Sequence, residues 1–187
     1  MELTASLVAE MADEYERREP FYAVERERLA TLPTAFDEGP MVRRDVEWVV
    51  RWYFRRDRTG SPSGRRERVE AAFGDNDAAE LEATLDAVHD ADGDRDRLAR
   101  LETLAGVDVA VASAILQYVD PDRYLAVDAR LWSVLRAAGH LDGPYPAPPS
   151  RADYERFVTT CRTLADRFDV DLQTLYRALW RLSADRA

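Results

Sequence analysis

Residues 101–135 read LETLAGVDVAVASAILQYVDPDRYLAVDARLWSVL. The apolar spacing of this stretch predicts two helices joined by a tight turn at Gly106, then a polar loop and a third helix. Glycine permits the turn because it adopts positive φ without steric cost. Pro121 cannot continue the second helix, and Asp128 stands where the third helix needs an N-cap.

The rest of the chain predicts an all-α, compact multi-helix domain that covers residues 1–187. Residues 59–64 (TGSPSG) resemble a flexible linker, 139–149 form a proline-rich surface loop, and no strand pattern occurs. Pro33 is expected to end the second helix of the chain. Apolar periodicity and capping residues predict helices at about 2–18, 20–30, 42–56, 65–73, 78–89, 150–168 and from 171 onward.

The charge of the chain is strongly acidic. It has 36 acidic and 26 basic residues, a net charge of −10, and every basic residue is arginine. An acidic surface on which arginine replaces lysine indicates a salt-rich cytoplasm. High-GC codon usage would also produce a lack of lysine. Net acidity argues against nucleic-acid binding. That argument weakens in molar salt, where exposed charges more than about 3 Å apart are largely screened from each other.

Cysteine and histidine are too few for a disulfide or a structural zinc site. Cys161 is the single cysteine, and His89 and His140 are the only histidines. No metal or cofactor is expected. The sequence carries no secretory signal, membrane-length apolar run or lipidation motif, which predicts a soluble cytoplasmic protein without a membrane partner.

The layout of residues 98–137 resembles the helix-hairpin-helix plus Gly/Pro-loop-aspartate superfamily of DNA base-excision glycosylases. The hairpin would occupy 98–119, and the proline loop with its Asp-capped helix would occupy 120–137. Gly106 and Asp128 are 22 positions apart, as in the family motif. Residues 127–132 (VDARLW) look most like the 8-oxoguanine-glycosylase branch. The residues that carry the resemblance are Leu104, Gly106, Val107, Ala112, Val127 and Asp128.

The resemblance implies that Asp128 is the catalytic carboxylate. In that family the matching aspartate stabilises the positive charge that develops on deoxyribose as the base leaves, or activates a nucleophile. A helix N-terminus favours a negative charge, so the position suits this role. The alternative interpretation is a plain N-cap, which contributes about 1 kcal/mol to stability.

Two positions depart from the family pattern. Ala110 stands where bifunctional members place a lysine that forms a Schiff base with the sugar, and the chain contains no lysine. A glycosylase of this sequence would therefore be monofunctional. Asp108 replaces the second glycine of the hairpin, whose backbone N–H groups at Gly106, Val107 and position 108 hold a DNA phosphate in the family. Aspartate tolerates the left-handed conformation, so we expect the turn to survive and its phosphate site to weaken.

Residues 43–68 form a basic segment, with nine arginines against four acidic residues. It is either a phosphate-contacting surface or a solvated helix face paired with the acidic remainder. Trp132, one turn after Asp128, either lines a pocket for an extruded base or belongs to the core. The candidate DNA-binding arginines are Arg51, Arg55, Arg58, Arg65 and Arg66.

Two functional hypotheses follow from these observations. The first is a monofunctional DNA glycosylase-like enzyme that acts on damaged bases in double-stranded DNA. The second is a non-catalytic descendant of the same fold that serves as a nucleic-acid-binding or protein-interaction module. The spacing to Asp128 and the basic segment favour the first hypothesis, whereas Ala110 and Asp108 favour the second.

Overall fold

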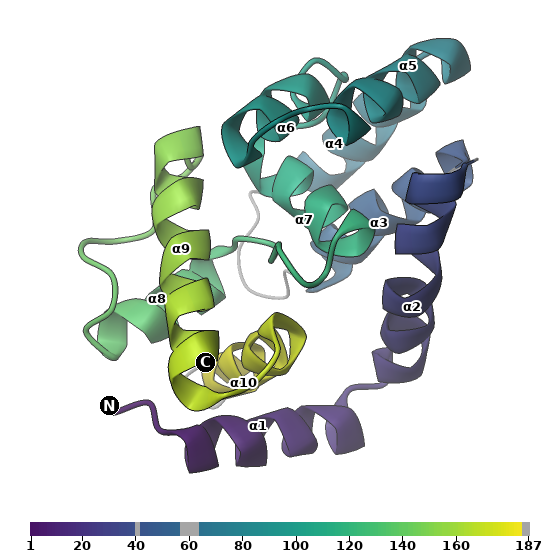
Figure 1. The fold of residues 1–187 in the computed structure, drawn as a ribbon. Coiled ribbons are helices and arrows are strands. Elements are labelled where there is room, and N and C mark those ends of the chain that lie inside the picture. The colour runs from purple at the N-terminus through teal and green to yellow at the C-terminus, as the bar shows by residue number, and fades with distance from the viewer. Residues whose placement is uncertain (40–41, 57–63, 185–187) are drawn as a thin grey trace.

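The computed structural model describes residues 1–39, 42–56 and 64–184, and this part of the chain is helical, without any strand (Figure 1). The all-α class predicted from the sequence is confirmed. In chain order the helices are α1 (Ala5–Arg18), α2 (Tyr22–Glu38), α3 (Arg43–Arg56), α4 (Arg65–Gly74), α5 (Ala78–His89), α6 (Asp94–Leu101), α7 (Val109–Val119), α8 (Ala129–Ala137), α9 (Arg151–Phe168) and α10 (Leu172–Ala184).

Helix α7 is the centre of the core, since all of its residues are buried. It contacts α2, α3, α6 and α9, and α1 packs along α10 at the other side of the molecule (Figure 1). Ala110, Ala112 and Ala114 give α7 a thin cross-section. Helix axes approach more closely when the contacting side chains are small, so α7 accepts neighbours on every side.

Helix α2 corrects the prediction of a break before Pro33. The helix continues through Pro33 to Glu38. Proline removes one backbone hydrogen bond and clashes with the preceding turn, which costs about 3 kcal/mol in a helix interior. Leu32 is buried and Phe36 packs against the core. The tertiary contacts of these two side chains, which local sequence rules do not include, keep the helix intact.

The turn between α6 and α7 forms at Gly106, as predicted, with φ of +79°. A Cβ atom at this position would lie 2.8 Å from the carbonyl oxygen of Val69 in α4, so both the conformation and the packing require glycine. Asp108 corrects a second expectation. Its φ of −98° and ψ of 176° are extended, because it is the N-cap of α7 and needs no left-handed conformation.

Candidate functional site

Residues 120–128, which we call the strap, connect α7 to α8 and run back along α7. The amide of Ala126 donates to Oε1 of Gln117 (2.7 Å), and the amide of Val127 donates to Oγ of Ser113 (2.9 Å). Ser113 and Gln117 are one turn apart on α7, so the strap lies antiparallel to the helix. Through these two buried polar side chains, the strap places Asp128 beside the N-terminal end of α7.

Asp128 is the N-cap of α8, as the sequence predicts. One carboxylate oxygen, Oδ1, accepts hydrogen bonds from the backbone amides of Arg130 (2.9 Å) and Leu131 (2.8 Å). The side chain is half-buried. The positive end of the helix dipole stabilises the negative charge of this carboxylate, and the two bonds fix its orientation.

Asp108 caps α7 and is paired with an arginine from α4. Its Oδ1 accepts from the amide of Val111 (3.0 Å), and its Oδ2 accepts from Nη2 of Arg65 (2.6 Å). The Arg65 guanidinium also lies over the ring of Phe54, 5.2 Å from the centroid. Burial lowers the pKa of Arg65, but the charge and hydrogen bond of Asp108 outweigh it and raise the pKa overall. The ion pair therefore keeps Arg65 charged.

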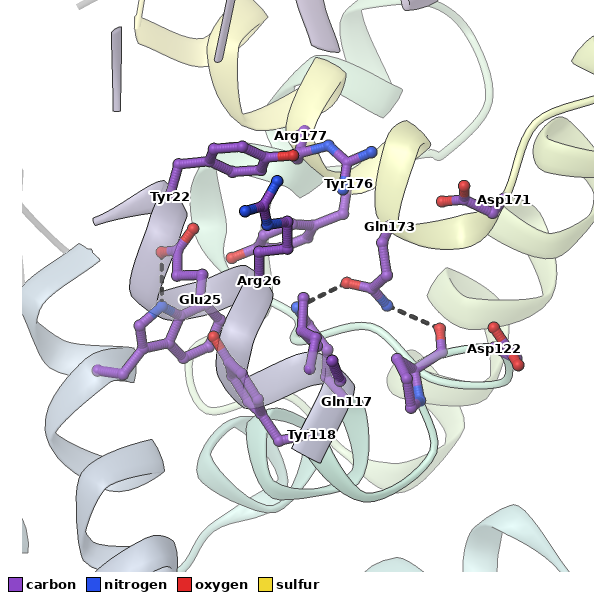
Figure 2. A pocket seen from close by; sticks show the side chains of 14 residues that line it. Tyr22, Glu25, Arg26, Gln117, Tyr118, Asp122, Asp171, Gln173, Tyr176 and Arg177 are labelled. Atoms are coloured by element: carbon purple, nitrogen blue, oxygen red, sulfur yellow. Dashed lines mark hydrogen bonds between the residues drawn. The ribbon is translucent and has the colours of Figure 1, made fainter. Parts of the chain in front are cut away.

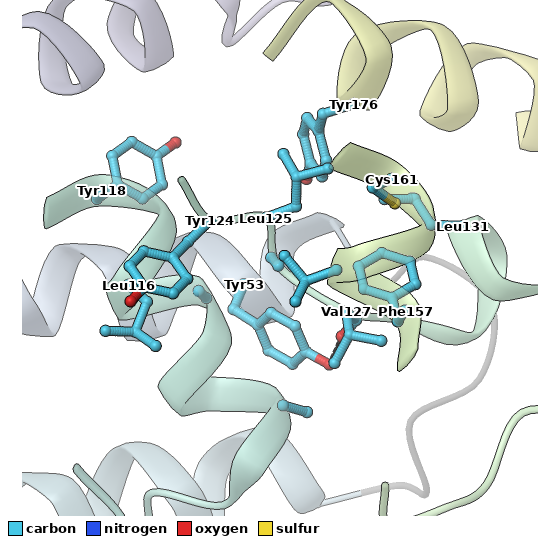
Figure 3. Close-up of a cluster of buried hydrophobic side chains, with 14 of the residues drawn as sticks. Tyr53, Leu116, Tyr118, Tyr124, Leu125, Val127, Leu131, Phe157, Cys161 and Tyr176 are labelled. Atoms are coloured by element: carbon cyan, nitrogen blue, oxygen red, sulfur yellow. Dashed lines mark hydrogen bonds between the residues drawn. The ribbon is translucent and has the colours of Figure 1, made fainter. Parts of the chain in front are cut away.

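Two tyrosines complete this site. Tyr53, from α3, donates its hydroxyl hydrogen to the carbonyl oxygen of Val127 at 3.1 Å (Figure 3). Tyr145 comes from the loop after α8. Burial raises the pKa of both phenols, and the negative charges of Asp128 and Asp108 raise both further. These charges act on both rings, so the five side chains form one electrostatic unit. We call it the double-cap cluster: Asp108, Asp128, Arg65, Tyr53 and Tyr145.

Sequence reasoning predicted three members of the double-cap cluster and missed both tyrosines. Asp128, Asp108 and Arg65 were candidates, but the direct pairing of the last two was not foreseen. Tyr53 belongs to the apolar stripe of α3, where its residue type indicated packing alone. Tyr145 stands between two prolines of a surface loop, and nothing in its spacing connects it to Asp128.

Trp132 lies in the core in this structure. The side chain is 1% exposed. Its Nε1 donates to the carbonyl oxygen of Gly143 (3.2 Å), and its ring meets the ring of Tyr145 edge to face at 5.9 Å. These contacts, together with the ring of Phe157 stacked at 6.5 Å, agree with the packing interpretation of Trp132, and the base-pocket interpretation stays a prediction.

Two of the candidate DNA-binding arginines pair with acidic residues on their own helices. Arg51 lies 3.6 Å from Glu47 in α3, and Arg66 lies 2.6 Å from Glu70 in α4. Both pairs have the spacing of neighbours on one helix face. Exposed pairs of this kind contribute little to stability, so both guanidiniums remain able to exchange a carboxylate for another anion.

The remaining candidate arginines differ in their surroundings. Arg55 is exposed, with its guanidinium 5.9 Å from the ring centroid of Phe21. Arg58 lies outside the described residues. Arg65 is the member of the basic segment that the structure brings to Asp108, within the double-cap cluster. Among the described candidates, the structure thus places one arginine beside the carboxylates and three on helix faces, and phosphate contact by these arginines stays a prediction.

Comparisons with models of protein families, with curated proteins and with solved structures found no match to this chain. Among residues 1–39, 42–56 and 64–184, no three His, Cys, Asp or Glu side chains are grouped to hold a metal ion. None of the helices in these ranges is long and apolar enough to cross a membrane. The thiol of Cys161 is buried, which raises its pKa and removes it from reactive thiol chemistry at neutral pH.

Proposed function

We propose that this chain is a monofunctional, DNA glycosylase-like protein that releases damaged bases from duplex DNA, with Asp128 as its catalytic carboxylate. The observation that carries the proposal is the position of Asp128 at the N-terminus of α8, half-buried and held by two backbone amides. The strap fixes this position through Ser113 and Gln117. The resemblance of residues 98–137 to the glycosylase motif supports the same role.

The proposed reaction breaks the bond between C1′ of the sugar and the base nitrogen. The base leaves with the bonding electron pair, and positive charge develops on the deoxyribose ring. A fixed carboxylate at that point stabilises the developing charge. A water oxygen then bonds to C1′, and the proton that this water loses neutralises the departed base anion, which leaves an abasic site and a neutral free base. Ala110 is buried at the first turn of α7 and supplies no amine, so the strand is not cleaved through a Schiff base.

In this proposal the contact with DNA phosphates comes from arginines. The carboxylate of Asp108 already accepts from the amide of Val111 at the start of α7, and its charge would repel a phosphate there. Arg65 balances that charge, and the exposed Arg51 and Arg55 offer further cationic groups. A bound phosphate neutralises such guanidiniums and displaces their counterions, which makes binding salt-dependent.

A release assay on duplexes with single lesions tests the proposal, with 8-oxoguanine first. The assay is run in molar potassium chloride and at lower salt, with the parent protein and Asp128→Asn side by side. We expect the parent to leave an abasic site without strand cleavage, and Asp128→Asn to lose release while it keeps its fold. Absence of release from every lesion by folded parent protein would refute the enzymatic proposal.

One observation favours a second candidate, a nucleic-acid-binding module without catalysis. The Asp108 carboxylate, paired with Arg65, occupies the start of α7, where the glycosylase family binds a DNA phosphate. Such an internal carboxylate is expected in a fold that no longer uses this phosphate site. The same assay separates the two candidates. Duplex binding without base release, equal in parent and Asp128→Asn, would support the module.

A further inference from the structure

The first half of the strap is held by amide side chains. Nε2 of Gln173, in α10, donates to the carbonyl oxygens of Pro121 (2.7 Å) and Tyr124 (3.3 Å). Oε1 of Gln173 accepts from Nε2 of Gln117, in α7, at 3.0 Å (Figure 2). Beside this pair, a cavity of about 320 Å³ lies at the C-terminal end of α7, between α2, α10 and the strap. These contacts fix the course of the strap but lie several residues before Asp128.

Two hydroxyl groups hold the residue immediately before Asp128. The Val127 amide donates to Oγ of Ser113 in α7 (2.9 Å). The Val127 carbonyl oxygen accepts from the hydroxyl of Tyr53 in α3 at 3.1 Å (Figure 3). The carbonyl group of Val127 and the nitrogen of Asp128 belong to one peptide unit, which is planar. The bond from Tyr53 therefore fixes the plane from which the Asp128 side chain departs.

The hydroxyl of Tyr53 is not needed to fill the core. The Tyr53 side chain is 7% exposed, and the next residue of α3 is a buried phenylalanine, Phe54. A hydroxyl in an apolar core costs free energy unless it is hydrogen-bonded. Burial raises the pKa of Tyr53, so the phenol keeps the hydrogen that it donates. The contribution of this hydroxyl to the structure is therefore its bond to Val127.

We infer that Tyr53 is a positioning residue for Asp128. Tyr53 fixes the peptide unit before Asp128, and the amides of Arg130 and Leu131 fix the carboxylate from the other side. A catalytic group that moves by about 1 Å can lose about a hundredfold in rate. The effect on base release rests on the proposed glycosylase function, whereas the effect on the orientation of Asp128 does not.

The arginines of α3 lie on the face opposite to Tyr53. Arg51 and Arg55 are exposed, and each is two positions from Tyr53. Successive residues of a helix are rotated by about 100°, so two positions correspond to opposite sides. Removal of the Tyr53 hydroxyl leaves these arginines in place. It should therefore lower the rate of release at saturating duplex, without a change in the duplex concentration that gives half of this rate.

Amide exchange followed by NMR tests the inference without any need for activity. Tyr53→Phe removes the hydroxyl and keeps the ring. We expect the amides of Arg130 and Leu131 to exchange about fivefold faster in this variant. The amide of Ala79, at the capped N-terminus of α5, should exchange as it does in the parent. This pattern would show a local loosening of Asp128 rather than a general loss of stability.

Tyr154→Phe is the matched control. Tyr154 is also buried, but its hydroxyl forms no hydrogen bond with another group in the described part of the chain. Exchange at Arg130 and Leu131 should be that of the parent in this variant. In the base-release assay we expect a rate about tenfold lower or more for Tyr53→Phe, and within about twofold of the parent for Tyr154→Phe. Circular dichroism verifies both folds.

Three results would overturn the inference. One is exchange at Arg130 and Leu131 in Tyr53→Phe that equals that of the parent. Another is acceleration that is equal at Ala79, which would show a general loss of stability. The third is base release by Tyr53→Phe at the rate of an active parent. A folded parent that releases no base refutes the glycosylase proposal, and the exchange measurement then still decides the role of Tyr53.

Discussion

The two ends of α7 use polar residues in opposite ways. At the N-terminal end, the carboxylates of Asp108 and Asp128 are bound by backbone amides and Arg65. At the C-terminal end, Arg26 and Asp122 border an open cavity. The strap joins both ends, since it leaves the last turn of α7 and its amides at Ala126 and Val127 donate to Gln117 and Ser113 of the same helix. The N-terminal end therefore holds carboxylates in fixed positions, and the C-terminal end leaves a cavity.

The largest expected effect comes from replacing the glycine of the α6–α7 turn. Gly106→Ala puts a Cβ atom 2.8 Å from the Val69 oxygen and 3.0 Å from the Phe73 nitrogen, at φ of +79°. We expect a loss of about 3 kcal/mol or more in the free energy of unfolding, from left-handed strain and overpacking together.

Gly139→Ala is the control for this change. Gly139 has φ of +78° but no atom within 4 Å of a built Cβ, so strain alone should cost about 1–2 kcal/mol. Urea unfolding measures both variants. Equal losses would show that α4 does not press against the turn, and the described packing of the N-terminal end would be wrong.

The second prediction separates the strap from α7. Gln117→Leu removes the acceptor of the Ala126 amide and the donor to Gln173. Buried groups left without partners cost about 1–3 kcal/mol each, so we expect a loss of about 3 kcal/mol in urea unfolding. Base release should fall as well, because the strap positions Asp128. A variant of unchanged stability would contradict the role given to Gln117.

The third prediction concerns pH and a tyrosine of the strap. Burial, followed by the hydrogen bond to Asp94, raises the pKa of Tyr124 from 10.0 to about 12. The folded state thus favours the protonated phenol. This stabilisation is fully present below pH 10 and is lost as the pH rises through 12, and it amounts to about 2–3 kcal/mol.

Tyr124→Phe tests this pH dependence. Phenylalanine cannot ionise, so the variant should lose less stability between pH 10 and pH 12 than the parent does. It also loses the hydrogen bond to Asp94 and should be less stable at pH 8. Chemical unfolding at several pH values provides the comparison. Identical slopes against pH for both proteins would contradict the raised pKa.

The smallest expected effect is on duplex binding. Asp108→Asn keeps an N-cap for α7, since asparagine caps as well as aspartate, but it removes the charge that pairs with Arg65. Stability should fall by about 1 kcal/mol, and affinity for duplex DNA should rise by a factor of about five at low salt. Asp77→Asn, which changes the N-cap of α5 in the same way, is the control. If Asp77→Asn raised the affinity for duplex DNA as much as Asp108→Asn does, the change in net charge alone would explain the result.

Local features of the fold were predictable from the sequence. The turn at Gly106, the cap at Asp128 and most helix ends depend on residues within one turn of each other, and the structure confirms them. Such features follow from backbone conformation and from amides at helix ends that need acceptors. The catalytic role of Asp128 has no such local signal and stays a proposal.

Features that depend on distant residues were not predictable. Pro33 lies inside a helix because Leu32 and Phe36 pack on the core. Arg65 meets Asp108 across 43 positions of sequence, and Tyr53 reaches Val127 across 74. Periodicity reports which face of a helix is apolar, but not which partner that face meets. The cavity at the end of α7 belongs to the same class, since residues of α2, α3, α7, the strap and α10 line it.

The catalytic role of Asp128 is tested by single-turnover base release from an 8-oxoguanine duplex, measured for the parent, Asp128→Asn and Asp142→Asn. Asp142 is an exposed aspartate of the loop after α8, so its variant controls for the lost charge. We expect release by the parent and Asp142→Asn, with a loss of about a hundredfold or more in Asp128→Asn and intact abasic strands. Equal release by all three proteins, or none from folded parent, would contradict the catalytic role of Asp128.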